Sequence, residues 1–472
     1  MARRQAQRSP RLRWRGALVL AFATIGLSAC GGGGSLPPGD TPPRQGSVRF
    51  VNAIPDGPNI TAFLSGIAFG PEDFAQATPL TKELVAIYTL NVEYFDPQGG
   101  ITDLKVVQDI ELTQEKEISF VLIGPWANPT LLRIDNVEID FGITPNDGHL
   151  NKAGVQVVHG ATSIGPVDVY LTAFGADLST ATPIASVNFG DVGQLLTIAP
   201  NAAYQVRVTD PGTTNVLFDS GTFGIDGFTR QIFLLRDNFG PSGKSFRVTR
   251  VTADGALQFP NEGTQTSMRF GNFIADAPAV DVYFTDTMHP PTFTNAPFAQ
   301  LLPRTLVSPG GLVVPIKVTA AGTTTPLVLD SNIGVAADTF QTVLAGGLDA
   351  KDTTAVVSMI DDPRTIAPEA RLRFMNVSPE AGGVDVYVLP PGLPIADTPA
   401  TLPGVALNSA PVTPLLEGSY DVTVTRAGSQ TVLIGPERIS VELGNHQYTL
   451  ALTDSDGGGS PIVLRRYDDL AP

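Results

Sequence analysis

The sequence predicts an all-β protein of four tandem immunoglobulin-like β-sandwich domains that follow a signal peptide and a flexible tether. Three observations predict this fold class: a sixteen-residue phrase that occurs four times, strands with alternating apolar and polar residues, and turn residues between them. The phrase begins at Arg49, Gln156, Arg269 and Arg373, at intervals of 107, 113 and 104 residues. Such a repeat is too long for one turn of a solenoid and has the length of a domain.

Each phrase predicts a strand, a turn and a second strand. In the last three copies the second strand reads Val-Asp-Val-Tyr, at 167–170, 280–283 and 384–387. Because side chains alternate along a strand, the valines share one face, and the Asp and Tyr share the other. Asp276-Ala277-Pro278, between the two strands of the third copy, is typical of a turn.

A second strand pair follows 30 to 50 residues later in each copy. Its first strand and the glycine of its turn are Tyr204–Thr209 with Gly212, Val314–Thr319 with Gly322, and Tyr420–Thr425 with Gly428. The first copy is looser here, with Tyr88–Phe95 before Gly99. Late strands are predicted at Gln231–Leu235 and Gln447–Leu452, and the second and fourth copies add closing strands at Ser245–Val251 and Pro461–Arg466. About seven short strands per hundred residues is typical of a two-sheet sandwich.

This pattern divides the chain into six parts. They are a signal peptide (1–29), an acylated cysteine with a Gly/Pro-rich tether (30–46), and four β-sandwich repeats (47–150, 153–262, 266–360 and 368–472). The joints between the repeats are short and contain proline. We therefore expect a semi-rigid row of repeats.

The N-terminus resembles the signal of a bacterial lipoprotein. Residues 1–29 hold six arginines, no acidic residue and the short apolar run Gly16–Leu27, which is too short to span a membrane. The segment Leu27–Gly31 is similar to a lipobox, which implies that Cys30, the only cysteine of the chain, is acylated. The alternative is an ordinary signal peptide with an incidental thiol. Gly31–Gln45 lacks apolar anchors, and about fifteen flexible residues reach about 20 Å.

Composition limits the classes of partner. Removal of residues 1–29 leaves 24 basic and 46 acidic residues, a formal charge of −22. This charge argues against nucleic acid and anionic lipid headgroups, since both need a basic face. With no cysteine after Cys30, no disulfide can form within a repeat, so each sandwich depends on its apolar core.

No motif indicates a catalytic residue, a metal site or a cofactor. The four histidines, His149, His159, His289 and His446, lack metal-ligand spacing, and the sequence has no nucleophile elbow, phosphate-binding loop or dinucleotide fingerprint. A triad assembled from distant positions remains compatible with this pattern.

Two polar positions recur among the copies. Asn52, His159, Asn272 and Asn376 end the first strand of each phrase, where an amide can bond to local backbone. Asp168, Asp281 and Asp385 share one strand position, which Thr61 occupies in the first copy. These aspartates are interpreted as solvated or loop-bonding carboxylates, and the alternative is a calcium ligand at a domain junction.

Two further positions are candidate ligand contacts. Asp454-Ser455-Asp456-Gly457 is similar to the start of a calcium loop, but Arg465 stands where the loop needs Glu, so a hairpin turn explains it better. Trp126, on a predicted loop, is a candidate contact for a sugar ring, and the alternative is that it covers the end of the first sandwich.

The phrase, most clearly at 269–284 and 373–388, resembles the repeat of a bacterial surface-domain family known as domain of unknown function 4397. The resemblance covers the four copies, and the first two depart from the pattern at Thr61-Ala62-Phe63 and before Val167. It implies exported or lipid-anchored proteins with immunoglobulin-like sandwiches, and it implies no catalytic residues.

We therefore expect a non-enzymatic spacer or binding module, held at the membrane through lipid on Cys30, that recognises an envelope protein or a polysaccharide. Gly31 lacks the charge associated with inner-membrane retention, which favours the outer membrane. The alternative is an envelope hydrolase whose active site assembles only in space.

Overall fold

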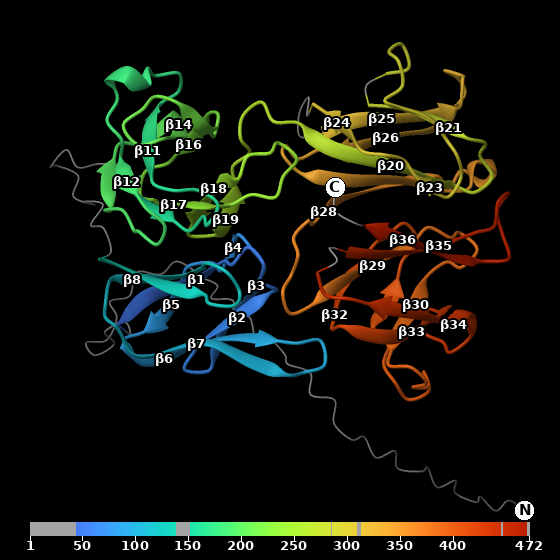
Figure 1. Cartoon of the computed structure of the whole chain (residues 1–472), viewed down its shortest axis with the longest axis horizontal. Coiled ribbons are helices and arrows are strands. Elements are labelled where there is room, and N and C mark those ends of the chain that lie inside the picture. Colours follow the sequence, from blue (N-terminus) through green and yellow to red (C-terminus); the bar gives the residue numbers. More distant parts are fainter. Residues whose placement is uncertain (1–43, 138–151, 285, 309–312, 445–446, 470–472) are drawn as a thin grey trace, which may run out of the picture. The chain divides into compact units, whose positions relative to one another are not determined.

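The computed structural model describes residues 44–137, 152–284, 286–308, 313–444 and 447–469. These residues form an all-β protein with eight sheets (Figure 1), which confirms the predicted fold class. Besides strands they contain two short 3₁₀ helices, η1 (Leu178–Thr180) and η2 (Asp349–Lys351). No helix in the described ranges has the length and apolarity to cross a membrane. Cys30, the signal peptide and nearly all of the tether lie outside these ranges.

The first repeat forms two sheets. One has the order β4-β1-β8-β9, with β5 also paired to β1, and the other has the order β3-β2-β6-β7. Strand β1 runs parallel to β8, and the other pairs are antiparallel. The strands are β1 (Gln45–Ala53), β2 (Ile60–Leu64), β3 (Ile67–Glu72), β4 (Gln76–Ala77), β5 (Thr81–Leu84), β6 (Ala86–Phe95), β7 (Ile101–Leu112), β8 (Lys116–Ile123) and β9 (Thr130–Val137).

The second repeat has the sheets β13-β10-β17-β18-β19 and β12-β11-β14-β15, with β16 paired to β14. Strand β10 again runs parallel to the late strand β17. The strands are β10 (Ala153–His159), β11 (Val167–Ala173), β12 (Ala185–Val187), β13 (Leu196–Ile198), β14 (Asn201–Thr209), β15 (Val216–Asp219), β16 (Phe223–Ile225), β17 (Arg230–Asp237), β18 (Phe246–Thr252) and β19 (Gly255–Gln258).

The third repeat has the sheets β23-β20-β27-β28, with β24 paired to β20, and β22-β21-β25-β26. Its strands are β20 (Thr266–Ile274), β21 (Val280–Tyr283), β22 (Phe293–Ala296), β23 (Gln300–Leu301), β24 (Thr305–Val307), β25 (Val313–Ala320), β26 (Leu327–Gly334), β27 (Phe340–Gly347) and β28 (Ala355–Asp361).

The fourth repeat has the sheets β32-β29-β35-β36 and β31-β30-β33-β34. Its strands are β29 (Ala370–Asn376), β30 (Val384–Leu389), β31 (Leu402–Val405), β32 (Val412–Leu415), β33 (Gly418–Arg426), β34 (Val432–Val441), β35 (Gln447–Thr453) and β36 (Val463–Asp469). In both of these repeats the first strand is parallel to the late strand, β20 to β27 and β29 to β35.

The strands lie where the sequence patterns predict them. The three Val-Asp-Val-Tyr segments are in β11, β21 and β30, and their valines point into the sandwich cores. One expectation was incomplete, because β9 and β28 are closing strands in the first and third repeats as well. The first strand also begins at Gln45, before the predicted boundary at residue 47.

Each repeat has its own apolar core between its two sheets. In the fourth repeat, for example, Phe374 of β29 packs with Val386 of β30 and Val424 of β33. Three repeats also carry a tyrosine whose hydroxyl donates to a backbone carbonyl four or five residues upstream, a feature of immunoglobulin-like sandwiches. These tyrosines are Tyr88, Tyr204 and Tyr420. The division into four separate domains stays a prediction.

Two further apolar clusters lie between repeats. Val51 and Val121 of the first repeat pack with Val158 and Leu234 of the second. Phe273 of the third packs, in the same way, with residues of the fourth that include Met375. The first strand of each phrase is therefore buried on both faces.

The expected row of repeats is wrong. Tyr94 of the first repeat donates its hydroxyl proton to Glu369, at the start of the fourth, over 3.0 Å. Arg364, in the joint before the fourth repeat, forms an ion pair with Asp73 of the first (2.8 Å). Such contacts require the first and fourth repeats to touch, and repeats joined only end to end could not do this.

Candidate functional site

The recurring asparagines bind backbone rather than a ligand. At Asn376 the amide nitrogen donates to the carbonyl oxygens of Gly382 (2.7 Å) and Val405 (3.1 Å). Its oxygen accepts from the backbone N–H two residues further on. Asn52 and Asn272 make bonds of the same kind, so this position ties the end of the first strand to the turn and the second sheet.

His159 replaces this asparagine in the second repeat. Its Nε2 lies 3.0 Å from the carbonyl oxygen of Gly165, six residues on, as Gly382 is from Asn376. The ring is fully buried, and Nδ1 has no hydrogen-bond partner among the described residues. The structural interpretation of this position is therefore correct for the histidine too.

The recurring aspartates hold hairpin loops. Asp385 accepts from the backbone N–H groups of Gly404 (2.6 Å) and Gly428 (2.8 Å). Asp168 and Asp281 accept in the same way from Gly212 (2.7 Å) and Gly322 (2.8 Å). Of the two interpretations, loop bonding is confirmed. Within the described ranges, no group of three or more His, Cys, Asp or Glu side chains is placed to hold a metal ion.

Asp454 is also a loop-bonding residue. It lies in the hairpin between the antiparallel strands β35 and β36, as the hairpin interpretation predicts. Its buried carboxylate accepts from the Ser378 hydroxyl and from the N–H groups of Glu380 (3.2 Å) and Gly459 (2.9 Å). These bonds tie the hairpin to the loop after the first strand of the fourth repeat.

Trp126 lies against the first sandwich. It is partly buried on the core of that repeat, and its ring meets the ring of Tyr94 edge to face at 5.3 Å. Its backbone N–H donates to Asp56 (2.7 Å). This placement fits the interpretation that it covers the end of the sandwich, and a direct ligand contact stays a prediction.

One candidate ligand site is an open cavity of about 570 Å³ between the first and fourth repeats. This volume is within the usual range for sites that bind small molecules. The cavity is lined by charged, amide and aromatic side chains, among them Asp73, Tyr94, Phe95, Glu369, Arg371 and Gln447. Hereafter it is called the 1–4 cavity.

Ion pairs hold the charged side chains of the 1–4 cavity in place. Arg371 contacts Asp362 directly, and its other terminal nitrogen is 3.5 Å from Asp73. Arg364 joins the same two carboxylates, at 2.7 and 2.8 Å. Burial alone would raise the pKa of Asp362, but Arg364 and Arg371 outweigh it and hold that pKa below its ordinary value.

The pKa of Glu369 is shifted in the opposite direction from that of Asp362. Burial raises the pKa of its carboxyl group, against the lowering effects of the Tyr94 hydrogen bond and of Arg371. Burial and the neighbouring Glu369 also raise the pKa of Tyr94. The cavity thus combines a carboxyl group that holds its proton more readily with carboxylates fixed in ion pairs.

A smaller cavity, of about 220 Å³, lies where the first three repeats meet. The ring of Phe74 is between two guanidinium groups, Arg236 at 5.1 Å and Arg364 at 4.9 Å. Burial lowers the pKa of Arg236 to about 9, and the charges of Arg247 and Arg364 add to this effect.

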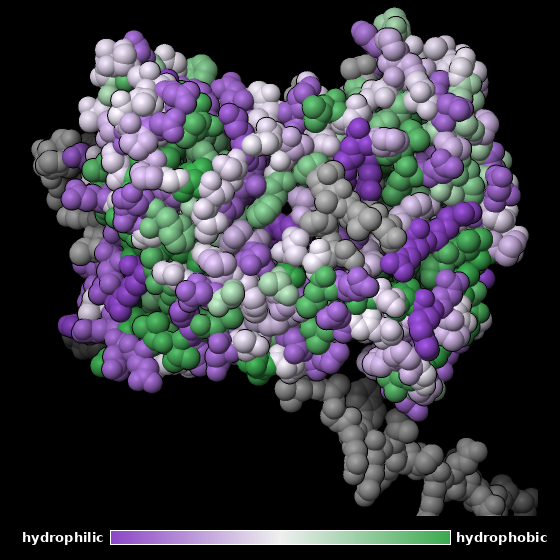
Figure 2. Space-filling view, viewed as in Figure 1, coloured by the Kyte–Doolittle hydropathy of each residue, from purple (hydrophilic) through white to green (hydrophobic). Residues whose placement is uncertain are grey.

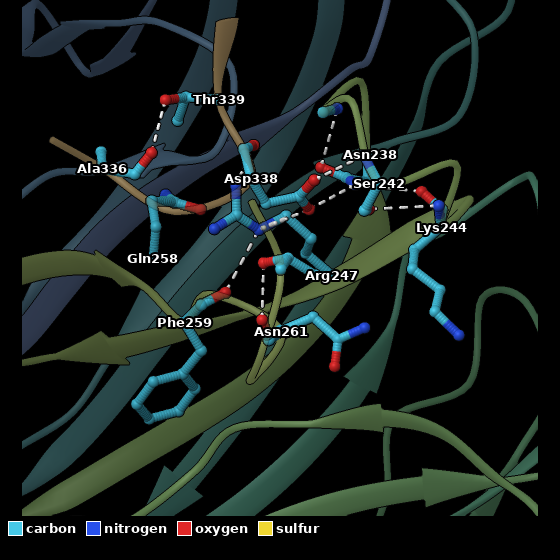
Figure 3. Close-up of polar contacts among 12 residues, drawn as sticks. Asn238, Ser242, Lys244, Arg247, Gln258, Phe259, Asn261, Ala336, Asp338 and Thr339 are labelled. Atoms are coloured by element: carbon cyan, nitrogen blue, oxygen red, sulfur yellow. Dashed lines mark hydrogen bonds and ion pairs between the residues drawn. The ribbon is translucent and has the colours of Figure 1, made fainter. Parts of the chain in front are cut away.

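The carboxylate of Asp338 joins the second and third repeats beside this cavity (Figure 3). It is fully buried and accepts from Asn238 Nδ2 (2.9 Å) and the backbone N–H of Ser242 (3.0 Å), with Arg247 Nε at 3.9 Å. Arg247 in turn donates to the Phe259 carbonyl oxygen (3.2 Å). These groups satisfy one another, which indicates a structural joint.

Of the other predicted positions that the structure describes, Thr61 lines the 1–4 cavity, and the rest line neither cavity. His289 is exposed, with Nδ1 2.8 Å from Asp286. Cys30, His149 and His446 lie outside the described residues. The sequence did not indicate Asp73, Tyr94, Glu369 or Arg371 as site residues, because Tyr94 and Glu369 are 275 positions apart and belong to no motif.

Residues 266–387 match the family described as Domain of unknown function (DUF4397). The match begins with β20 and ends in β30, so it includes the phrase of the third repeat and that of the fourth. The predicted family resemblance is confirmed for this part. For the rest of the chain it stays a prediction.

No curated protein sequence was found to match the chain. One similar solved structure is described as "Alpha-glucan binding by a streptococcal virulence factor". It is 12% identical, the similarity covers 43% of this chain and 96% of that chain, and the TM-score is 0.16. A TM-score this low does not establish a shared arrangement of strands.

Proposed function

We propose that the protein is a non-enzymatic, lipid-anchored envelope protein that binds a polysaccharide in the 1–4 cavity. The cavity lining carries this proposal. Carboxylate, guanidinium and amide groups present donors and acceptors in planes, as the hydroxyl groups of a sugar require. Phe95, whose side chain is 44% exposed, supplies a flat apolar face for the C–H side of a ring.

The charges favour a neutral sugar over an ionic ligand. Arg371 and Asp362 neutralise each other, and Arg373, also in the lining, is paired with Asp361 at 2.5 Å. A ligand with its own charge would have to compete with these pairs and would lose hydration without a free partner. A neutral glycan segment can bond to them without breaking them.

Anchoring follows from the N-terminal sequence. The lipobox-like segment makes Cys30 the acylation site, and Gly31 after it favours the outer membrane of a Gram-negative cell. Mass spectrometry of the protein from its own host should find lipid on Cys30 and residues 1–29 removed. A free thiol with the leader still attached would overturn the anchoring.

Binding is tested with a glycan array offered to the mature chain with Cys30→Ser. We expect Phe95→Ala to weaken binding about tenfold, which corresponds to about 1.4 kcal/mol. Phe174→Ala is the matched control, since Phe174 is similarly exposed (53%) in the second repeat and does not line the cavity. Equal effects of the two changes would argue against the 1–4 cavity as the site.

The alternative, an envelope hydrolase, has one observation in its favour, namely the raised pKa of Glu369. Glycoside hydrolysis needs such an acid together with a second carboxylate that acts on the sugar. The nearby carboxylates, Asp73 and Asp362, are engaged by Arg364 and Arg371. Mass spectrometry of the bound glycans should therefore recover them uncut, and shortened products would support the hydrolase.

A further inference from the structure

The first repeat exposes four consecutive apolar residues, Leu84-Val85-Ala86-Ile87, hereafter the apolar corner. The exposed fractions are 54% for Leu84, 39% for Val85 and 69% for Ile87. Ala86 is exposed as well. A run of this length on the surface of a soluble domain is unfavourable unless it serves a function. Figure 2 shows hydrophobic residues gathered at lower left, over the region where β5, β6 and β7 lie in Figure 1.

The fold does not require apolar residues at this corner. The corner precedes Tyr88, whose hydroxyl donates to the Leu84 carbonyl oxygen (2.7 Å). In the fourth repeat Tyr420 makes the same bond to Leu416 (2.9 Å), and the three residues between are Glu417, Gly418 and Ser419. In the second repeat the residues before Tyr204 are Pro200-Asn201-Ala202-Ala203. The tyrosine hydrogen bond therefore forms in the other copies without an apolar run at this corner.

The apolar corner lies where the chain enters the first sandwich. The backbone N–H of Val85 donates to the carbonyl oxygen of Arg44 (3.0 Å), the first described residue, and Leu84 is paired with Gln45. Arg44 is fourteen positions after Cys30. Another exposed apolar side chain, Ile67 (42%), is in the hairpin whose Ser65 N–H donates to the Thr89 carbonyl oxygen.

We propose that the apolar corner rests in the interfacial layer of the same bilayer that holds the lipid on Cys30. This inference depends on the proposed anchoring. The tether predicted from the sequence would reach about 20 Å, so a lipid-anchored first repeat would stay within reach of the membrane surface. Apolar side chains that enter the interface add to the binding that an acyl chain provides.

The chemistry of the corner fits this occupant. The Leu84 carbonyl and the Val85 N–H are already hydrogen-bonded within the protein, so burial in lipid leaves neither of these two groups unpaired. Arg44 and Lys82, both exposed, flank the corner and can reach the headgroups of a neutral membrane. The docked first repeat would present the remaining repeats at a fixed orientation from the membrane.

The test uses the single cysteine of the mature chain. A maleimide phospholipid coupled to the free Cys30 thiol of protein produced without its signal peptide anchors the protein to phosphatidylcholine vesicles, so the test does not need acylation by a cell. In the variant Ile87→Trp, we expect the emission of the new tryptophan to shift to the blue on these vesicles and to be lost when the lipid chains are brominated. The parent protein, which keeps Trp126, supplies the background.

Two controls accompany this variant. Leu306→Trp places a tryptophan at a similarly exposed site (57%) in the third repeat and should show neither the shift nor the quenching. Val85→Glu with Ile87→Ser gives the first repeat two of the three corner residues of the fourth, Glu417 and Ser419. It should stay on the vesicles but lose the vesicle-dependent protection of residues 84–87 from hydrogen exchange.

Anchored protein whose residue 87 emission does not change on vesicles would overturn the docking and leave the anchoring intact. A blue shift that depends on protein concentration without vesicles would also overturn it, since a second copy would then cover the corner. Failure of the anchoring has a different signature, an unmodified Cys30 in protein from the host.

Discussion

Asp385 and its counterparts show how one carboxylate can organise two loops. Each lies on the outer face of a central strand and is covered by the turn of the following hairpin, whose glycine has a left-handed backbone: φ is 69° at Gly212, 77° at Gly322 and 71° at Gly428. That conformation suits glycine, and it aims the N–H at the carboxylate.

Removal of this carboxylate should weaken the fold. Asp385→Ala breaks two hydrogen bonds to an ionised group and should lower the free energy of unfolding by about 2 kcal/mol. Urea denaturation measures the effect. Asp103→Ala, at an exposed position of β7, is the control and should change stability by less than about 0.5 kcal/mol. Equal losses in both variants would contradict the loop-bonding role.

The first repeat lacks the recurring strand aspartate and has an aspartate in the following turn instead. It carries Thr61 in place of the aspartate, and the corresponding hairpin contains Asp96, which accepts from the N–H groups of Gln98 (2.7 Å) and Gly100 (2.9 Å). In this repeat the carboxylate that bonds to the turn therefore belongs to the turn itself. The exchange is visible in the sequence, since the first copy has Thr61 at the strand position and Asp96 in the turn before Gly99.

The raised pKa of Glu369 predicts that the free energy of unfolding depends on pH. Because its pKa is higher in the folded protein than the ordinary 4.5, the folded state binds more protons, and the free energy of unfolding falls as pH rises from 4.5 through the raised pKa. Glu369→Gln removes this loss, so its stability relative to the parent should increase from about pH 4 to pH 7. The exposed change Glu111→Gln is the control, and its free energy of unfolding should differ from that of the parent by the same amount at every pH. The same constant difference for Glu369→Gln would contradict the prediction.

At the scale of elements, the first strand of each phrase has two buried faces. In β1, Phe50 points into the core of its own sandwich, and Val51 packs against the second repeat. A strand buried on both sides loses the alternation of apolar and polar residues, as parallel central strands do. The continuous apolar run at the start of the phrase was a signal of an interface, although it does not tell which surface covers the second face.

Buried arginines accompany these strands. Glu117 lies between Arg49 of the same repeat (3.0 Å) and Arg230 of the second (2.7 Å). In the other pair of repeats, Asp361 lies between Arg304 (2.7 Å) and Arg373 (2.5 Å). Arg49 and Arg373 hold the same place in the phrase. One carboxylate shared by two arginines therefore recurs at both interfaces.

Loss of the shared carboxylate should be costly. Glu117→Ala removes the negative charge that two buried guanidinium groups share and should lower the free energy of unfolding by about 3–5 kcal/mol. The control is Asp330→Ala, which breaks an exposed pair with Lys317 and should cost less than about 1 kcal/mol. Urea denaturation distinguishes them, and a similar small loss for both would show that the buried triad does not stabilise the interface.

At the scale of the whole molecule, local patterns predicted most of the strand positions along the chain and almost none of the contacts between repeats. Strands and turns depend on residues near one another in the chain, so Val-Asp-Val-Tyr and the turn glycines were sufficient to place them. The contact of Tyr94 with Glu369 depends on groups 275 residues apart. Short joints with proline are compatible with a row and equally with repeats that fold back, and the 1–4 cavity exists only in the second case.

The interfaces predict that the repeats unfold together. Where apolar clusters join two repeats, opening one exposes the buried face of the other, so the two lose stability as a unit. Calorimetry of residues 44–472 should show fewer unfolding transitions than the four that independent domains would give.

The hydrogen exchange of a single variant tests the same coupling. Val121→Asp, in the cluster between the first two repeats, should speed hydrogen exchange in β10 and β17 as well as in β8. The exposed change Gln108→Asp should leave both repeats unaffected. Faster exchange confined to the first repeat would mean that the shared cluster does not couple them, because each sandwich would then keep its strands without its neighbour.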